Sequence, residues 1–194
     1  TKAKALEKLS KFGVKIGYPS KWRDYSKLQI REGDLAGNAE RASKFGWDFS
    51  GHEKSGLLKF LCEYPGTKYP EEHLMAVIDI LDHSEIKRCV VDSLSAISNV
   101  YGMSEFRMFL LRLSGILKSR GVTAIFITAT GDFIQTEKLT DARISTITDA
   151  IIFLKYVEIN AEMRLMASVI KTRGNDHSRS LREYRITQNG ITVG

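Results

Sequence analysis

The sequence has little of what marks several classes of protein. It contains only two cysteines in 194 residues, too few for a secreted fold built on disulfides. No stretch approaches the roughly 20 consecutive apolar residues of a membrane-spanning helix, and the first residues have no apolar run of a secretory signal. Cys62 and Cys89 each lie within an apolar run. The sequence therefore predicts two buried structural thiols in a cytoplasmic protein without a membrane partner.

Two motifs of catalysis are also missing. His52-Glu53 is followed by Lys-Ser-Gly, so no H-E-x-x-H helix forms there, and His73 and His83 have no partner at ligand spacing. Because zinc needs three or four converging ligands, we expect no zinc and no zinc peptidase activity. The sequence also has no G-x-x-x-x-G-K-[ST] phosphate-binding loop. The glycine-bounded segment GHEKSG at 51–56 carries its lysine in the wrong frame.

Positive charge is present but dispersed. The net charge is +6, which permits binding to phosphates or nucleic acid without specifying either. The basic residues spread from Lys2 to Arg185 and form no tight tract. A dedicated nucleic-acid groove is therefore the least favoured function, since such a groove needs a clustered basic face.

What the sequence does contain, from Leu57 onward, is an alternation of apolar strands and amphipathic helices. Short apolar runs predict strands, and they lie at 57–62, 89–93 and 122–128. Apolar residues at helical spacing predict a helix from about 70 to 81 and another from 104 to 119, with Ser104 as N-cap and Gly121 as stop. Such alternation indicates a parallel sheet covered by helices on both faces.

The pattern changes towards the end of the chain. Three apolar segments at 149–159, 163–172 and 181–187 follow one another with short connections. Closely spaced strands without helices predict antiparallel pairing that extends the sheet. The predicted fold class is therefore α/β, with a mostly parallel sheet flanked by helices and finished by C-terminal antiparallel strands.

The segment KRCVVDSLSAI at 87–97 places Asp92 at the carboxyl end of a predicted buried strand. Ligands bind beyond the carboxyl ends of parallel strands, and a carboxylate there can hold Mg²⁺ through its water shell. Asp92 is thus the candidate metal ligand of a Walker B motif, and the Ser93 hydroxyl would steady a metal-bound water or a phosphate oxygen. Taken alone, the pattern equally fits an aspartate that ends a strand and caps a turn.

The segment VIKTRG at 169–174 adds two cations. Lys171 and Arg173 alternate onto one side of a strand and a glycine follows. Arginine offers paired donors and lysine a point charge, which together suit a phosphate chain. Taken alone, an edge strand protected by positive charge explains the same residues.

Four segments in this order and spacing resemble the KaiC family of circadian clock ATPases and autokinases: CVVDSLSAI, FRMFLLRLSGILKSRGVTAIFIT, LTDARISTITDAIIFLKYVEI and VIKTRGNDHSRSLREYRIT. GWDF followed by LLKFLCEYP is similar to the same family. The resemblance covers about residues 38–194 and implies that the predicted α/β sheet is RecA-like. It implies ATP and Mg²⁺ as ligands, self-assembly into a hexameric ring, and clock proteins as partners.

The resemblance also implies roles for single residues. ARISTITD matches the phosphorylated segment of the family's kinase-active domain, which makes Ser145 and Thr146 the expected phosphate acceptors. Lys171 and Arg173 match residues that reach ATP on the neighbouring subunit. Three further residues are assigned by motif. Arg107 is expected to act across the same interface, and His177 lies in a loop that contacts the nucleotide in the family. Glu32 occupies the first position of a glutamate pair that supplies a general base.

The chain departs from the family at its front end. The family's domain begins with a phosphate-binding loop, whose backbone N–H groups and lysine hold the phosphates, and this chain has none. The glutamate pair is broken because Gly33 follows Glu32. We therefore expect an ATPase and autokinase domain that is weak or inactive.

Residues 2–45 have a resemblance of their own. KALEKLSKFGVKIGYPSKWRDYSKLQI is similar to a segment of neprilysin-type zinc metallopeptidases that lies ahead of their zinc site. The predicted division of the chain is thus a helical and loop segment at 1–45 without a zinc site, and the C-terminal part of a KaiC-like domain at 46–194. Helices are expected at about 3–12 and 38–45, and KLQI is expected to add a strand. A chimera with a structural or assembly role and no catalysis remains the alternative hypothesis.

Overall fold

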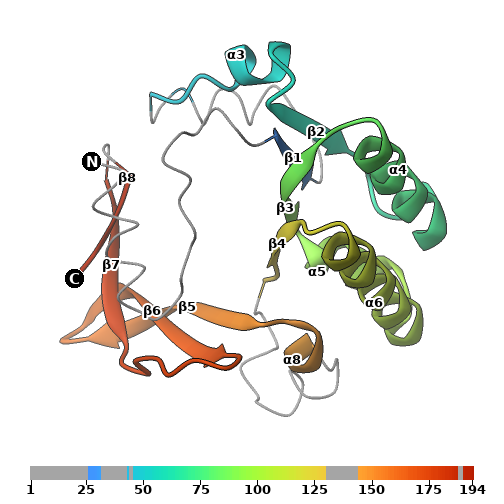
Figure 1. Cartoon of the computed structure of the whole chain (residues 1–194). Coiled ribbons are helices and arrows are strands. Elements are labelled where there is room, and N and C mark those ends of the chain that lie inside the picture. The colour runs from blue at the N-terminus through green and yellow to red at the C-terminus, as the bar shows by residue number, and fades with distance from the viewer. Residues whose placement is uncertain (1–25, 32–42, 44–45, 130–143, 188–189) are drawn as a thin grey trace. The chain divides into compact units, whose positions relative to one another are not determined.

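The computed structural model describes residues 26–31, 43, 46–129, 144–187 and 190–194. Two compact units account for them, one within Ser20–Ile147 and one within Thr148–Gly194. We call them the parallel unit and the antiparallel unit and describe each by itself (Figure 1). The helices expected at 3–12 and 38–45 lie outside the described residues, so they stay predictions, as does the division of the chain at residue 45.

The parallel unit is built on a four-stranded sheet in the order β2-β1-β3-β4. Its strands are β1 (Ser26–Arg31), β2 (Leu58–Cys62), β3 (Ile86–Asp92) and β4 (Thr123–Ile127). All three pairings are parallel, as the alternation of strands and helices predicts. The expected strand KLQI is confirmed as part of β1, and it lies inside the sheet between β2 and β3.

The described residues of this unit include five helices: α3 (Phe49–Lys54), α4 (Pro70–Asp82), α5 (Leu94–Val100), α6 (Met103–Ser119) and α8 (Ile144–Ile147). The sequence predicted the two long ones, α4 and α6. The other three have six, seven and four residues, too short for a helical repeat of apolar residues to stand out. None of the described helices has the length and apolar character that a membrane crossing requires.

The first turns of α4 and α6 show why these helices begin where they do. In α4, Pro70 occupies the first turn, where its missing N–H costs nothing, and Glu72 accepts a hydrogen bond from the Tyr69 amide at 2.7 Å. In α6, Glu105 accepts from the Gly102 amide at 3.3 Å. The prediction of Ser104 as N-cap was therefore wrong, because the helix begins at Met103, directly after its glycine cap, and already includes Ser104.

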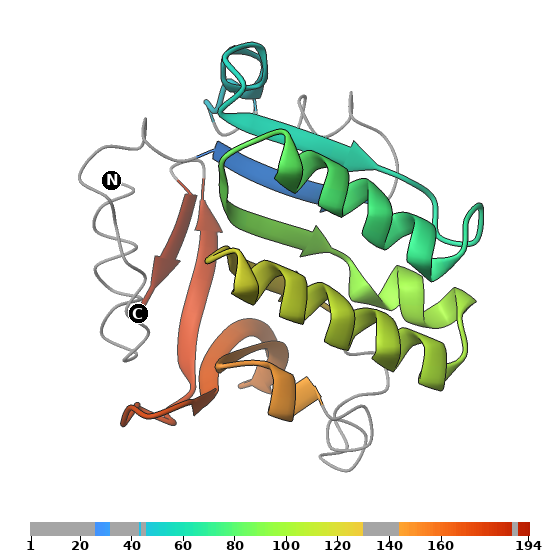
Figure 2. The same ribbon diagram turned by 45° about the vertical axis from the view of Figure 1, so that its right-hand side comes forward.

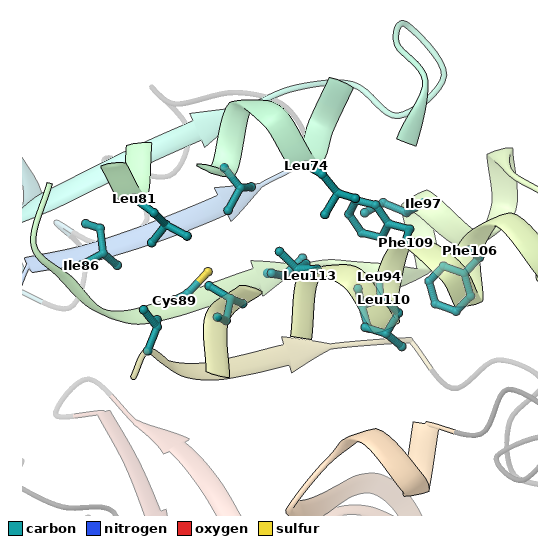
Figure 3. Packing of buried hydrophobic residues seen from close by; sticks show 14 residues of the cluster. Leu74, Leu81, Ile86, Cys89, Leu94, Ile97, Phe106, Phe109, Leu110 and Leu113 are labelled. Carbon is teal, nitrogen blue, oxygen red and sulfur yellow. The ribbon is translucent and has the colours of Figure 1, made fainter. Parts of the chain in front are cut away.

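Both long helices pack on one face of the parallel sheet. Figure 2 shows α4 and α6 side by side across it, and Figure 3 shows the core between them and the strands. The buried residues of this core come from α4, β3, α5, α6 and the residue just before β4: Leu74, Val77, Leu81, Ile86, Cys89, Val91, Leu94, Ile97, Phe106, Phe109, Leu110, Leu113, Leu117 and Val122. On the opposite face of β4, Ile125 and Ile127 remain 58% and 41% exposed. Coverage of both faces, as predicted, is not found among the described residues.

The antiparallel unit is a separate four-stranded sheet in the order β5-β6-β7-β8. Its strands are β5 (Ala150–Ile159), β6 (Glu162–Thr172), β7 (Arg182–Thr187) and β8 (Gly190–Val193). The first three match the predicted strands, and β8 was not predicted. In the described residues these strands pair with one another and not with β4, so they form a second sheet where the sequence predicted an extension of the first.

Candidate functional site

Asp92 is the last residue of β3 and Ser93 follows it directly, before α5 begins. In the sheet register Asp92 lies opposite Arg31 of β1 on one side and Ile127 of β4 on the other. The peptide bond between Asp92 and Ser93 is cis, and both side chains are half-buried. The predicted placement of Asp92 at the carboxyl end of a buried parallel strand is confirmed.

The strand order makes this end of the sheet a place where ligands bind in many α/β folds. The chain leaving β1 crosses to β2 on one side, whereas the chain leaving β3 crosses to β4 on the other. In α/β folds such a reversal commonly opens a crevice beyond the carboxyl ends of the two strands, and here these ends are Arg31 and Asp92. Glu32, the expected general base, follows Arg31 in the chain but lies outside the described residues.

Ser95 fixes the neighbouring strand end. Its Oγ accepts a hydrogen bond from the Ala129 amide at 2.7 Å and lies 3.1 Å from Oγ1 of Thr128. These contacts join the first turn of α5 to the residues that follow β4. The motif DSLS therefore begins with the last residue of β3 and ends with a serine that joins α5 to the residues after β4.

A buried carboxylate–imidazole pair lies beside Asp92 on the helical side of the sheet. Glu63 follows β2, His73 belongs to the first turns of α4, and Glu63 Oε2 is 2.6 Å from His73 Nδ1. The side chains are only 15% and 11% exposed. Burial pushes the pKa of Glu63 up, but hydrogen bonds from Lys68 and His73 outweigh burial, so the pKa lies below its usual value. Sequence analysis had considered His73 only as a zinc ligand and had found no second ligand at the right spacing; it had not predicted the contact with Glu63.

The segment GHEKSG does not form a phosphate cradle. Its first four residues lie in α3 and its last two follow that helix. The N-terminal amides of α3 are capped by a carboxylate, because Asp48 Oδ1 accepts from Ser50 N at 2.9 Å and from Gly51 N at 3.4 Å. The hydroxyl of Ser50 and the amides of Gly51 and Ser50 lower the pKa of Asp48. The donors that would hold a phosphate are therefore already bound to a negative group.

Lys171 and Arg173 lie in the antiparallel unit, at the end of β6 and just past it. Lys171 Nζ donates to the Thr148 carbonyl at 2.9 Å. The Arg173 guanidinium lies 3.4 Å from the carboxylate of Asp149, and its amide donates to the Asp149 carbonyl at 2.7 Å. Both cations thus contact the segment just before β5, which comes immediately after the two expected phosphate acceptors in the chain.

His177 is held in the same loop. Thr172 Oγ1 donates to the Asn175 carbonyl at 2.7 Å, so at 2.9 Å it accepts from His177 Nδ1. His177 Nε2 is buried, and nothing in the part of the chain that the structure describes hydrogen-bonds to it. The hydrogen bond between Nδ1 and Thr172 therefore fixes the orientation of the ring.

The remaining predicted residues lie on α6 and α8. Arg107 is half-buried in the second turn of α6. Ser145 and Thr146 both belong to α8, and Thr146 is exposed. Lys118 of α6 donates to the Ile147 carbonyl at 3.3 Å, which joins the end of α8 to the parallel unit.

The residue types around Asp92 fit Mg²⁺, which keeps several water ligands, better than a metal that is held only by protein side chains. Among the described residues no three His, Cys, Asp or Glu side chains gather as a metal site. Mg²⁺ commonly takes one or two carboxylates, several waters and substrate phosphates. Asp92 with the Ser93 hydroxyl offers that kind of ligand set.

The family model described as "ATPase: KaiC" matches residues 32–194. The chain belongs to the KaiC family. Its relatives include the circadian clock protein KaiC3 of Synechocystis sp. (strain ATCC 27184 / PCC 6803 / Kazusa), 40% identical over 153 residues, which are 79% of this chain and 30% of that protein. The circadian clock oscillator protein KaiC of Picosynechococcus sp. (strain ATCC 27264 / PCC 7002 / PR-6) is 37% identical over 155 residues, 80% of this chain and 30% of that protein.

A third relative, the circadian clock oscillator protein KaiC of Prochlorococcus marinus (strain MIT 9313), is 38% identical over 152 residues, 78% of this chain. This KaiC-family chain therefore spans about 30% of the length of these relatives. The predicted KaiC resemblance and the α/β fold class are confirmed. The resemblance of residues 2–45 to metallopeptidases finds no support in the comparisons and stays a hypothesis.

Proposed function

We propose that this KaiC-family chain is an ATP·Mg²⁺-binding domain with Ser/Thr autokinase character, weakened by the lack of a phosphate-binding loop. The observation that carries the proposal is the position of Asp92. It ends β3 at the reversal of strand order between β1 and β3, where in α/β folds a crevice commonly binds a ligand. Family membership makes ATP the ligand to test first.

In this proposal Asp92 holds Mg²⁺ through water and Ser93 steadies that water shell. The ion, when bound, neutralises charge on the β- and γ-phosphates. The reaction would join the γ-phosphorus to the hydroxyl oxygen of Ser145 or Thr146, break its bond to the β–γ bridging oxygen, and pass the hydroxyl proton to Glu32. Arg107 would stabilise the charge from across a subunit interface.

Lys171, Arg173 and His177 are proposed to contact the phosphates of a nucleotide held by a neighbouring copy. The side chain of Arg173 is 54% exposed, so it can exchange Asp149 for a phosphate at modest cost, because exposed ion pairs are worth at most about 1 kcal/mol. Self-assembly into a ring and binding to clock proteins are part of the same proposal, by analogy with relatives that are circadian clock proteins.

A second candidate function is a structural or assembly module without catalysis, formed as a chimera. One observation favours it: the family match begins at Glu32, while the central strand β1 comes from the residues before it. A foreign segment that supplies this strand would complete the sheet without supplying the phosphate loop. A titration separates the two candidates.

The test is a titration of fluorescent ATP with the full chain in the presence of Mg²⁺. The proposed function predicts saturable binding that is lost on chelation of the metal. The absence of saturable binding at millimolar nucleotide would leave the structural module as the function.

A further inference from the structure

The orientation of His73 is fixed by two neighbours. Its Nδ1 lies 2.6 Å from Glu63 Oε2, and because a carboxylate only accepts, Nδ1 carries the proton. Tyr101 stands edge-on to the imidazole with ring centroids 6.5 Å apart, and its hydroxyl donates to the Lys68 carbonyl. In the neutral ring, Nε2 is therefore a hydrogen-bond acceptor with a set direction.

That acceptor has no partner among the described residues although it is buried. His73 as a whole is only 9% exposed, so bulk water does not reach the nitrogen freely. Buried polar atoms are almost always hydrogen-bonded, to protein or to an ordered water molecule. A water molecule needs room and polar partners to take this place.

The room is present. A cavity of about 30 Å³ is lined by Glu63, His73, Asp92 and Ser93 together with the apolar side chains of α4, α5 and α6. One water occupies about 10–15 Å³ on this measure, so the cavity has space for about two. This space suits water, although its lining is mostly apolar apart from these four residues.

We propose that this cavity binds one or two ordered water molecules that donate to His73 Nε2 and link the Glu63–His73 pair to the Asp92–Ser93 end of β3. His73 is then a positioning residue: it touches no substrate and acts through water on the carboxylate beside the crevice. The role in Mg²⁺ binding rests on the proposed function, whereas the water site itself does not.

The two strand ends involved are not neighbours in the sheet, since β1 lies between β2 and β3. Backbone hydrogen bonds therefore cannot tie Glu63 to Asp92 directly. A water held by the imidazole from the helical side spans that gap. This is the structural reason for a buried histidine in the first turns of α4.

The direct test is nitrogen NMR of the full chain. We expect the imidazole of His73 in the Nδ1–H form, with cross-relaxation between its ring protons and a long-lived water. An Nε2–H ring, or a ring without such a water, would overturn the proposal. This arm needs no nucleotide, so it decides the water site even if the chain binds no ATP.

Variants test the positioning role. His73→Leu removes the acceptor, and we expect faster amide hydrogen exchange at Asp92 and Ser93, with rescue by His73→Gln, which keeps a polar end. The matched control is His83→Leu at the C-terminal end of the same helix, where Nδ1 lies 3.3 Å from Asp79 but the side chains are 75% exposed. Equal exchange in wild type and His73→Leu would contradict the role.

A last measurement connects the water site to the metal. If wild type binds ATP·Mg²⁺, His73→Leu should raise the Mg²⁺ concentration for half-maximal binding about 10-fold, as changes behind a metal ligand typically do. The metal-free affinity and the His83→Leu affinity should stay as in wild type. No change in Mg²⁺ requirement would refute the positioning role, whereas no binding by wild type would refute the proposed function instead.

Discussion

Arg31, the last residue of β1, lies opposite Asp92, the last residue of β3, in a parallel register. These two strand ends define the crevice on which the functional account depends, because the chain turns away from them in opposite directions. The sheet, the core and the buried residues behind Asp92 each lead to a prediction.

The core on the helical face of the sheet should carry most of the parallel unit's stability. Leu113 on α6 is 0% exposed, whereas Leu111 on the same helix is 43% exposed. We expect Leu113→Ala to lower the free energy of unfolding by about 2–5 kcal/mol, because it removes buried methyl groups and leaves a cavity. The matched change Leu111→Ala should alter it by less than about 0.5 kcal/mol. Urea unfolding checks both, and equal losses would contradict this core.

The two cysteines should differ in reactivity. Cys89 on β3 is 1% exposed, and burial raises the pKa of its thiol to about 12, whereas Cys62 is half-buried and is not part of a disulfide. Since the thiolate is the reactive form, a thiol reagent should modify the folded protein at Cys62 only and reach both cysteines in denaturant. Cys62→Ser should abolish labelling of the folded chain. Rapid labelling of Cys89 in the folded Cys62→Ser variant would show that β3 is not buried as described.

Acid should lower the folding stability of the protein because it protonates Glu63. Its pKa is lowered in the folded state, so its ionised form adds stability that is complete above the unfolded value of 4.5. That stability is lost as pH falls through the lowered folded value. Glu63→Gln should therefore lower the Tm at neutral pH, and the difference in Tm between the variant and wild type should become smaller in acid. Thermal unfolding across this range checks it, with the exposed change Glu53→Gln as control; a gap that is constant with pH would contradict the pairing.

The proposed phosphate acceptors lie together on α8. After incubation with ATP and Mg²⁺, mass spectrometry should find phosphate on Ser145 or Thr146, and Ser145→Ala combined with Thr146→Ala should remove it. Thr148→Ala is the control, because it lies just past α8 and its contact with Lys171 uses the backbone carbonyl. Phosphate that persists in the double variant would place the acceptor elsewhere.

Sequence patterns predicted the long elements because periodicity is strong there. The stripe of Phe106, Phe109, Leu110, Leu113 and Leu117 predicted α6, and all five are buried. Short elements such as α5 offer too few repeats, and the N-cap of α6 was misplaced because Gly102 has no side chain to mark it. Asp92 was found because its strand is apolar and its position is typical of a metal ligand.

The pairing of the strands was harder to predict. That β5 to β8 form their own sheet depends on which edges hydrogen-bond, and apolar patterns do not encode this. The Glu63–His73 pair joins residues from two elements, which no local motif reveals. Two hints were available in the sequence: Glu63 directly follows a predicted strand, and His73 precedes the apolar positions 74, 77 and 81 at helical spacing.

The most direct test of the account is the Mg²⁺ dependence of ATP binding in Asp92→Asn, compared with Asp79→Asn, an exposed aspartate on α4. We predict that wild type and Asp79→Asn bind fluorescent ATP more tightly when Mg²⁺ is present, and that Asp92→Asn loses this gain while folding normally. A gain from Mg²⁺ that survives in Asp92→Asn would contradict the central claim that Asp92 holds the metal at the crevice between β1 and β3.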